Sequence, residues 1–312
     1  MIVFIVKGQF IVKIWSAMAF MRKEKNFKRV KNKGEKEPFN SSNEQENIER
    51  SLSTQTRKRQ TEFGYVIKEL SALTGKSAEQ IKNECCLNQI QGFLSKTAKV
   101  IVRQDVTDKK AEEILLISSK LKVGEVIIAP AYLGAVRRIV DKNNLLNLRI
   151  TLLIDFPFGE SSFKSKLTEI KIGKDVGVDG VTVVISNALL KDKNKKELLW
   201  QCKKFSKAFK GDCSLAVSAQ DAKIEQIKRI VSVAEKVKAK SVVFMFGTGE
   251  EKEIKEKLEL IAENKGSLPI SVLASVSNVG ALQGLFSVGV DFVCTPYADE
   301  IGKELINKFK IS

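Results

Sequence analysis

The segment Ser241-Val242-Val243-Phe244-Met245-Phe246-Gly247-Thr248-Gly249 decides the predicted fold. Residues 242–246 form an apolar run, a Gly-Thr-Gly turn follows, and a charged helical pattern continues from 250 to 264. A buried strand, a glycine turn and a helix in this order are typical of a βα unit. In a barrel of such units, the C-terminal ends of the strands face the active site. Here that strand end carries only apolar side chains.

The same unit repeats along the chain from about residue 98. Apolar strands are predicted at 99–103, 125–129, 149–154, 180–185, 214–217, 241–246, 270–274 and 291–294. Helical stretches between them include 107–120, 162–175, 220–237 and 250–264. Nearly continuous apolar strands indicate a parallel sheet that is buried on both faces. Eight even units over 97–312 predict an α/β protein with a (β/α)8 TIM barrel. An open doubly wound sheet is the less favoured alternative, because no GxGxxG follows the first strand.

Residues 1–62 form a basic extension that is predicted to have little order. The first 60 residues hold 14 Lys and Arg against 6 Asp and Glu, so they carry 8 of the 16 net positive charges. Large apolar groups are sparse in 22–62, and such a segment cannot bury enough surface to offset the entropy of ordering. A short helical segment is predicted at 63–96, with one helix at 65–73 and another from its N-cap Ser77 to about 93.

The apolar residues 1–21 are interrupted by Lys7 and Lys13. The longest uncharged run is shorter than the roughly 20 apolar residues that a membrane helix needs. A signal peptide places its positive charge ahead of the apolar core, whereas here the charge lies inside it. We therefore expect no transmembrane span. A start of translation at Met18 or Met21 explains the segment about as well.

Cysteine and histidine content limits the chemistry. The five cysteines show no CxxC spacing and their number is odd, which favours reduced thiols and a cytoplasmic location; they are Cys85, Cys86, Cys202, Cys213 and Cys294. The chain contains no histidine. This excludes His-based triads, His–Cys dyads and His-ligated metal sites. The sequence predicts neither a metal site nor a cofactor.

Several turns resemble those of the deoxyribose-phosphate aldolases, over about residues 97–312. The segments that carry the resemblance are Val126-Ile127-Ile128-Ala129-Pro130-Ala131-Tyr132, Leu152-Leu153-Ile154-Asp155-Phe156-Pro157-Phe158-Gly159, Gly177-Val178-Asp179-Gly180-Val181, Ala274-Ser275 and Phe292-Val293. The resemblance implies a TIM barrel, in agreement with the periodicity. It also implies descent from a lyase of the class I aldolase type.

Three catalytic positions follow from this resemblance, and none carries the family's residue. The Schiff-base lysine of the sixth strand falls on Val243, and the lysine that tunes it on the seventh strand falls on Leu273. The proton-relay aspartate of the fourth strand falls on Thr182. Val and Leu supply neither an amine nucleophile nor a tuning charge. We therefore assign no catalytic residue.

The family's phosphate site uses glycines and backbone amides after strands six to eight, as helix N-termini do. The matching residues, predicted to bind an anion weakly, are Gly247, Gly249, Ser277 and Asn278. A plain tight-turn role for the glycines is an equal alternative. Polar side chains expected at the mouth are Arg103, Asp105, Asp155, Glu160, Ser161 and Thr182. Asp155 replaces a glycine of the family and is predicted to be a solvated loop carboxylate or the cap of the next turn, with a new function as the alternative.

Three interpretations stay open. The favoured one is a non-catalytic relative that keeps the barrel for ligand binding or as a scaffold. The second is an active aldolase or lyase that acts on deoxyribose 5-phosphate or a related sugar phosphate by an altered mechanism. The third is nucleic-acid binding through 22–60, which is disfavoured because that segment lacks interleaved aromatic residues. The expected partners are a phosphorylated small molecule and a second copy of the chain in a homodimer.

Overall fold

The computed structural model describes Ser71, Thr74, Gly75 and residues 77–102, 106–191, 195–220, 222–247 and 251–309. The predicted basic extension 1–62 lies outside these residues, as does most of the predicted helix at 65–73. Contacts within the chain divide it into two units, 1–84 and 85–312, and the barrel belongs to the second.

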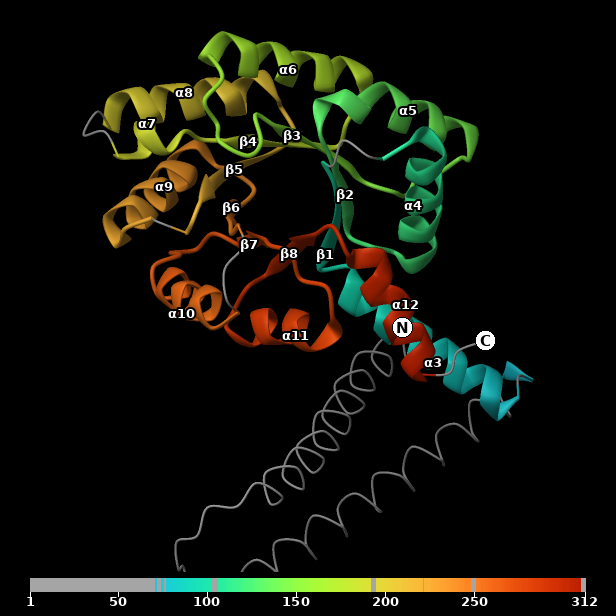
Figure 1. The fold of residues 1–312 in the computed structure, drawn as a ribbon. Coiled ribbons are helices and arrows are strands. Elements are labelled where there is room, and N and C mark those ends of the chain that lie inside the picture. The colour runs from blue at the N-terminus through green and yellow to red at the C-terminus, as the bar shows by residue number, and fades with distance from the viewer. Residues whose placement is uncertain are drawn as a thin grey trace, which may run out of the picture. The chain divides into compact units, whose positions relative to one another are not determined.

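Eight parallel strands close into a barrel, and each pairs with its neighbours in chain order (Figure 1). The strands are β1 Thr97–Ile101, β2 Glu125–Ile128, β3 Ile150–Ile154, β4 Gly180–Val184, β5 Asp212–Ser218, β6 Val242–Met245, β7 Ile270–Leu273 and β8 Phe292–Thr295. Each matches a strand predicted from the sequence, with ends that differ by at most two residues. Because β8 pairs with β1, the TIM barrel is confirmed and the open doubly wound sheet is excluded.

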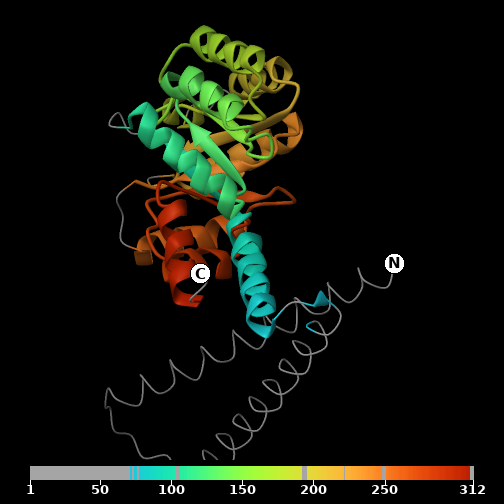
Figure 2. The ribbon, with the colours of Figure 1, turned by 90° about the vertical axis from the view of Figure 1, so that its right-hand side faces the viewer.

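The helices cover the outside of the barrel, as the two views at right angles show (Figure 1; Figure 2). They are α4 Asp108–Leu121, η1 Pro130–Tyr132, α5 Leu133–Lys142, α6 Phe163–Val176, α7 Asn187–Lys191, α8 Lys195–Ala208, α9 Ile224–Val237, α10 Glu251–Ala262, α11 Val279–Ser287 and α12 Ala298–Phe309. Helix α3, Ala78–Leu94, precedes β1. Within the described ranges, none of the helices combines the length and apolar character that crossing a bilayer requires.

Polar side chains define where several helices begin. Ser162 accepts a hydrogen bond from the backbone of Ser165 at the start of α6. At the start of α3, the Ser77 hydroxyl accepts from the Gln80 backbone while the Gln80 side chain accepts from the Ser77 backbone. This reciprocal pattern is a capping box, and it satisfies two amide groups that the helix leaves without partners. The prediction of Ser77 as N-cap is confirmed.

Alternate residues of each strand contribute to two separate cores. The larger core lies between the sheet and the helices and includes Val126, Ile154 and Phe244. The second core fills the barrel and consists of Ala98, Val100, Ile127, Leu153, Val184, Ala216, Val243, Met245, Leu273 and Cys294. We call this second group the inner cluster. Burial on both faces of the sheet explains why the strands are nearly continuous apolar runs.

Candidate functional site

The candidate site is the C-terminal end of the barrel, where the loops that follow the strands meet. Two of the predicted catalytic positions, Val243 and Leu273, belong to the inner cluster and are 3% and 8% exposed. Thr182 is 3% exposed and lies on β4, opposite Leu153 and Ser214. All three predicted catalytic positions therefore face the inside of the barrel. Thr182 on β4 lies two strands away from Val243 on β6.

Strand β6 has two residues in the inner cluster, at different depths. Val243 lies opposite Ser271 of β7, whereas Met245 lies opposite Leu273. Neighbouring strands are about 4.8 Å apart, so Leu273 has Met245 and not Val243 as its direct neighbour across the sheet. A lysine that tunes another by like charge must lie close to it. The register therefore adds Met245 as a second position to which the family's nucleophile can correspond.

Asp155 follows β3 directly and has a backbone φ of 63°, in the left-handed region that favours glycine. Its carboxylate accepts hydrogen bonds from the backbone N–H of Ser161, at 2.8 Å, and from the Ser161 hydroxyl, at 2.7 Å. The side chain is only 12% exposed. The predicted role as cap of the next turn is confirmed, and the prediction of a solvated carboxylate is wrong because Ser161 and α6 cover the group.

A buried lysine that the sequence analysis missed lies beside Asp155. Lys166 of α6 places its Nζ 3.1 Å from Asp155 Oδ2, and donates to the carbonyl oxygens of Gly159, at 2.6 Å, and Val184, at 2.9 Å. An ammonium group has three N–H donors; two of them have carbonyl acceptors here, and the Asp155 carboxylate forms an ion pair with the group. Lys166 lies on the same helix face as the buried residues Ile170 and Gly173, and this i, i+4, i+7 spacing could have revealed it.

One turn along α6, Glu169 joins this group. Its Oε2 atom is buried and has no hydrogen-bond partner among the described residues. Burial, together with the negative charge of Asp155, raises the pKa of the Glu169 carboxyl, although Lys166 opposes the shift. At the junction of β3, its loop and α6, the Lys166 ammonium thus pairs with the Asp155 carboxylate, and both charges act on the Glu169 carboxyl. The arrangement holds the loop against the helix.

The second buried lysine, Lys99, lies on β1. Its side chain points to the outside of the barrel, because the residues before and after it, Ala98 and Val100, point inward and belong to the inner cluster. Lys99 donates to the Asp299 carboxylate and to the Pro296 carbonyl oxygen, and Glu300 Oε2 lies 3.5 Å from its Nζ. A lysine inside an otherwise apolar strand was the signal in the sequence for such a buried pair.

The residues predicted to bind an anion are in part occupied by contacts within the chain. Gly247, Ser277 and Asn278 are exposed, but the Asn278 side chain already accepts from the Ala281 backbone as the N-cap of α11. The Val279 N–H, the first amide of that helix, donates to Glu304 Oε2 at 3.2 Å. Backbone amides at a helix N-terminus bind anions only where they have no other acceptor.

Some predicted mouth residues cannot be placed. Arg103, Asp105 and Gly249 lie outside the described residues. Glu160 is exposed, and Ser161 is a partner of Asp155. Among the predicted polar residues that the structure describes, only Asp155 and Ser161 come together.

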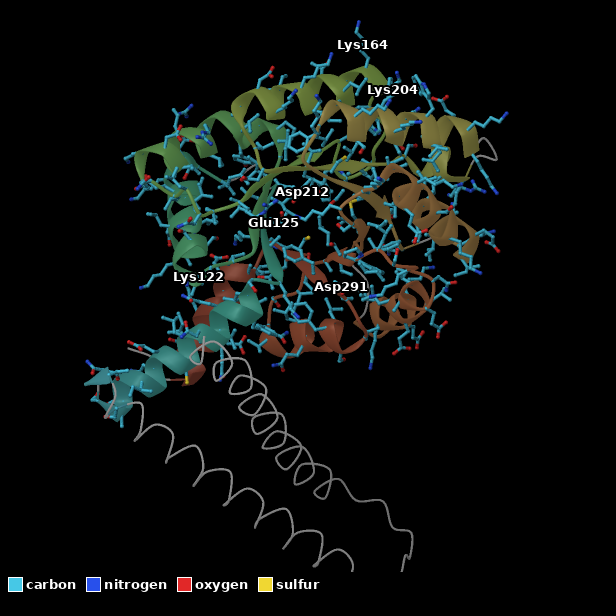
Figure 3. The ribbon with its side chains drawn as sticks, turned by 180° about the vertical axis from the view of Figure 1, so that it is seen from behind. Lys122, Glu125, Lys164, Lys204, Asp212 and Asp291 are labelled. Carbon is cyan, nitrogen blue, oxygen red and sulfur yellow. The ribbon has the colours of Figure 1, made fainter. Side chains whose placement is uncertain are left out.

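The opposite, N-terminal end of the barrel is polar. Glu125 accepts from the Thr151 hydroxyl at 2.7 Å, and Lys240 lies 3.6 Å from Glu125 and 3.2 Å from Asp212. Glu125 and Asp212 lie near the middle of the barrel in Figure 3. Arg149 completes the network with a 2.6 Å contact to Asp212. This end of a TIM barrel contributes to stability.

Comparison with known proteins identifies the fold. No protein-family model and no curated protein sequence match the chain. Among solved structures, the aldolase QR15 is similar with a TM-score of 0.62 and 17% identity, over 70% of this chain and 98% of that one. A deoxyribose phosphate aldolase from Aeropyrum pernix, described as tetrameric, has a TM-score of 0.62 and 13% identity, over 72% of this chain and 96% of that one. The protein therefore has the barrel fold of the deoxyribose-phosphate aldolases, as the sequence resemblance implied.

Proposed function

We propose that this protein is a deoxyribose-phosphate-aldolase-like barrel without Schiff-base chemistry, which serves in ligand binding or as a scaffold. The observation that carries the proposal is the inner wall of the barrel. At the C-terminal end of β6 and β7 this wall presents Met245 and Leu273, with Val243 one level deeper. None of these side chains has an amine that could attack a carbonyl carbon.

The buried lysines support the same proposal. Lys99 and Lys166 are each 4% exposed. Each ammonium group contacts a carboxylate and donates a hydrogen bond to a backbone carbonyl oxygen. A Schiff base requires a neutral amine with a free lone pair that the substrate can approach. A buried ammonium held by a carboxylate and backbone carbonyls offers neither, so both lysines serve the packing of helices against the barrel.

A phosphorylated small molecule is the ligand class that we propose for the mouth. Gly247 and Ser277 are exposed at the ends of β6 and β7 and could offer backbone amides. Because Asn278 and Val279 already have partners, such binding would be weak. A homodimer stays a prediction, which light scattering on the purified protein would test.

Borohydride trapping tests the proposal. The protein is incubated with deoxyribose 5-phosphate and sodium borohydride, and the intact mass is measured. We expect no adduct and no cleavage of the sugar phosphate above that of a heat-denatured control. An adduct that peptide mapping places on a lysine would overturn the proposal and support the alternative, an active aldolase or lyase of altered mechanism.

A further inference from the structure

Most of the net positive charge of residues 71–312 lies in one segment, 191–240. Residues 191–240 contain 14 Lys and Arg and 6 Asp and Glu, a surplus of 8. The rest of the region, 71–190 and 241–312, contains 24 Lys and Arg and 23 Asp and Glu, a surplus of 1. Residues 191–240 include α8, β5 and α9. A surplus on this scale creates a local potential that attracts polyanions.

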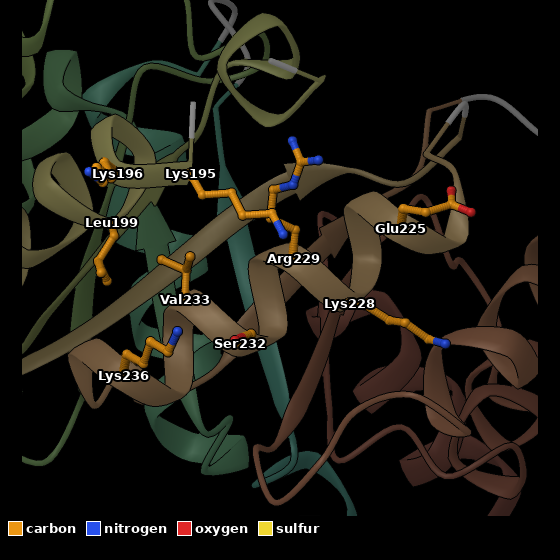
Figure 4. Close-up of a pocket in the computed structure, with 9 residues that line it drawn as sticks. All are labelled: Lys195, Lys196, Leu199, Glu225, Lys228, Arg229, Ser232, Val233 and Lys236. Atoms are coloured by element: carbon orange, nitrogen blue, oxygen red, sulfur yellow. The ribbon is translucent and has the colours of Figure 1, made fainter. Parts of the chain in front are cut away.

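A groove of about 540 Å³ lies between α8 and α9 of this segment. We call it the α8–α9 groove; its walls are Lys195, Lys196, Leu199, Glu225, Lys228, Arg229, Ser232, Val233 and Lys236. Figure 4 shows cationic side chains from both helices, with Leu199 and Val233 between Lys196 and Lys236. Five of these nine residues are cationic and one is acidic.

Four lysines of the groove have no carboxylate partner among the described residues. They are the exposed residues Lys195, Lys196, Lys228 and Lys236. Some exposed lysines elsewhere have a carboxylate partner: Lys110 lies 3.2 Å from Glu113, and Lys142 lies 3.0 Å from Glu112. Arg229 is different, because it donates to the Leu190 carbonyl oxygen at 2.6 Å and so helps to fix the groove. Unpaired lysines on two adjacent helices are available to an anionic partner.

The uncharged residues of the groove indicate what kind of polyanion it can bind. Only two of its nine residues have apolar side chains, Val233, which is 6% exposed, and Leu199, which is half-buried, so an apolar peptide side chain would find few partners there. The groove has no aromatic residue. Trp200, next to Leu199 in the chain, packs against Phe163 with 4.7 Å between the ring centres. The Nζ of Lys204 lies 5.8 Å from the centre of the Trp200 ring. Although Trp200 is 46% exposed, it does not line the groove, so unpaired bases would find no ring within the groove on which to stack.

We propose that the α8–α9 groove binds the phosphate backbone of a nucleic-acid duplex, independently of base sequence. In a duplex the bases are already stacked, and the phosphates are the groups that it presents. Lys228 and Lys236 are eight residues apart on α9, which corresponds to about 12 Å along the helix and to about three phosphates of one strand. Lys195 and Lys196 provide a second row on α8. This proposal does not depend on whether the barrel is catalytic.

Fluorescence anisotropy of the full chain with a labelled duplex of about 20 bp tests the proposal. If four lysines contact phosphates, the logarithm of the association constant should fall linearly with the logarithm of the salt concentration. The expected slope is about −3 or steeper. Changing Lys228→Gln and Lys236→Gln together should weaken binding and reduce the size of the slope by about 2. The pair Lys195→Gln and Lys196→Gln on the other wall should act in the same direction.

A matched control is Lys109→Gln with Lys303→Gln, which removes the same charge from α4 and α12. Both lysines are exposed, and these helices lie away from α8 and α9 in Figure 1. We expect the control to leave the slope unchanged; circular dichroism confirms that each variant is folded. Any contribution from residues 1–70 is common to all the variants. An equal loss in the control, no loss in the groove variants, or tighter binding of single strands or of polyglutamate than of the duplex would overturn the proposal.

Discussion

Lys99 on β1 and Asp299 on α12 form an ion pair in which both side chains are 5% exposed. Burial raises the pKa of the Asp299 carboxyl, but hydrogen bonds with Glu300 and Lys99 and the charge of Lys99 together hold it below its usual value. The two residues are 200 positions apart in the chain. The pair thus ties the first strand of the barrel to its last helix.

Removing one partner of this pair should destabilise the protein strongly. Lys99→Met leaves the Asp299 carboxylate buried without its cation, which we expect to lower the free energy of unfolding by about 3–5 kcal/mol. Urea denaturation measures the change. The control is Arg137→Met, which breaks a 2.8 Å contact with Asp141 between side chains that are 45% and 53% exposed. There we expect a loss below about 1 kcal/mol. Equal losses in the two variants would contradict the structural role of Lys99.

The same pair predicts a dependence of stability on pH. Since the pKa of Asp299 is lowered on folding, its contribution is fully present above the usual value of 3.8 and is lost as the pH falls through the folded-state pKa. Asp299→Asn should therefore be less stable than the wild type at neutral pH, and the gap should narrow in acid. Unfolding curves of both proteins across this range measure the gap. A gap that does not change with pH would contradict the prediction.

Two substitutions at Asp155 distinguish the loss of its side-chain contacts from the cost of its left-handed backbone. Asp155→Gly and Asp155→Ala both remove the contacts with Ser161 and Lys166, but only alanine keeps a side chain at a φ of 63°. We expect Asp155→Ala to be less stable than Asp155→Gly by about 1 kcal/mol. Thermal unfolding compares them. If alanine is the more stable of the two, the left-handed backbone does not constrain this position.

Restoring amine chemistry depends on which β6 residue receives the lysine. The resemblance suggests Val243→Lys with Leu273→Lys and Thr182→Asp, whereas the register places Met245 beside Leu273. We expect Met245→Lys with Leu273→Lys to give more borohydride-trapped adduct with an aldehyde than Val243→Lys with Leu273→Lys, because direct neighbours lower each other's lysine pKa more. Each buried charge should lower stability by a few kcal/mol. A higher yield from the Val243 pair would favour Val243 as the nucleophile position.

Three thiols should resist modification in the folded protein. Burial raises the pKa of Cys202 to about 12 and that of Cys213 to about 12, and it raises the pKa of Cys294 well above its usual value. The thiolate is the reactive form, so these residues should not react with Ellman's reagent at mildly alkaline pH until urea unfolds the chain. The half-buried Cys86 should react before these three thiols do. Mass spectrometry of the labelled peptides distinguishes the sites, and early labelling of Cys202 would contradict the described core.

Local patterns in the sequence were enough to predict the eight strands and the start of α3. A strand that is buried on both faces requires an apolar run, and the capping box at Ser77 joins residues only three positions apart. The resemblance at the strand ends also pointed to the correct barrel family of folds. These features depend on neighbouring residues, so no knowledge of the distant chain was needed.

Only the tertiary structure decided how distant residues meet. It placed Lys99 against Asp299, gave Lys166 two carbonyl acceptors and an ion pair with Asp155, and set Met245 and not Val243 opposite Leu273. It also brought the lysines of α8 and α9 to one groove. Each of these relations depends on strand register or on which helices pack side by side. The sequence determined that a parallel barrel forms, because its apolar periodicity is local; closure of the barrel determined which charges became buried pairs and which stayed free.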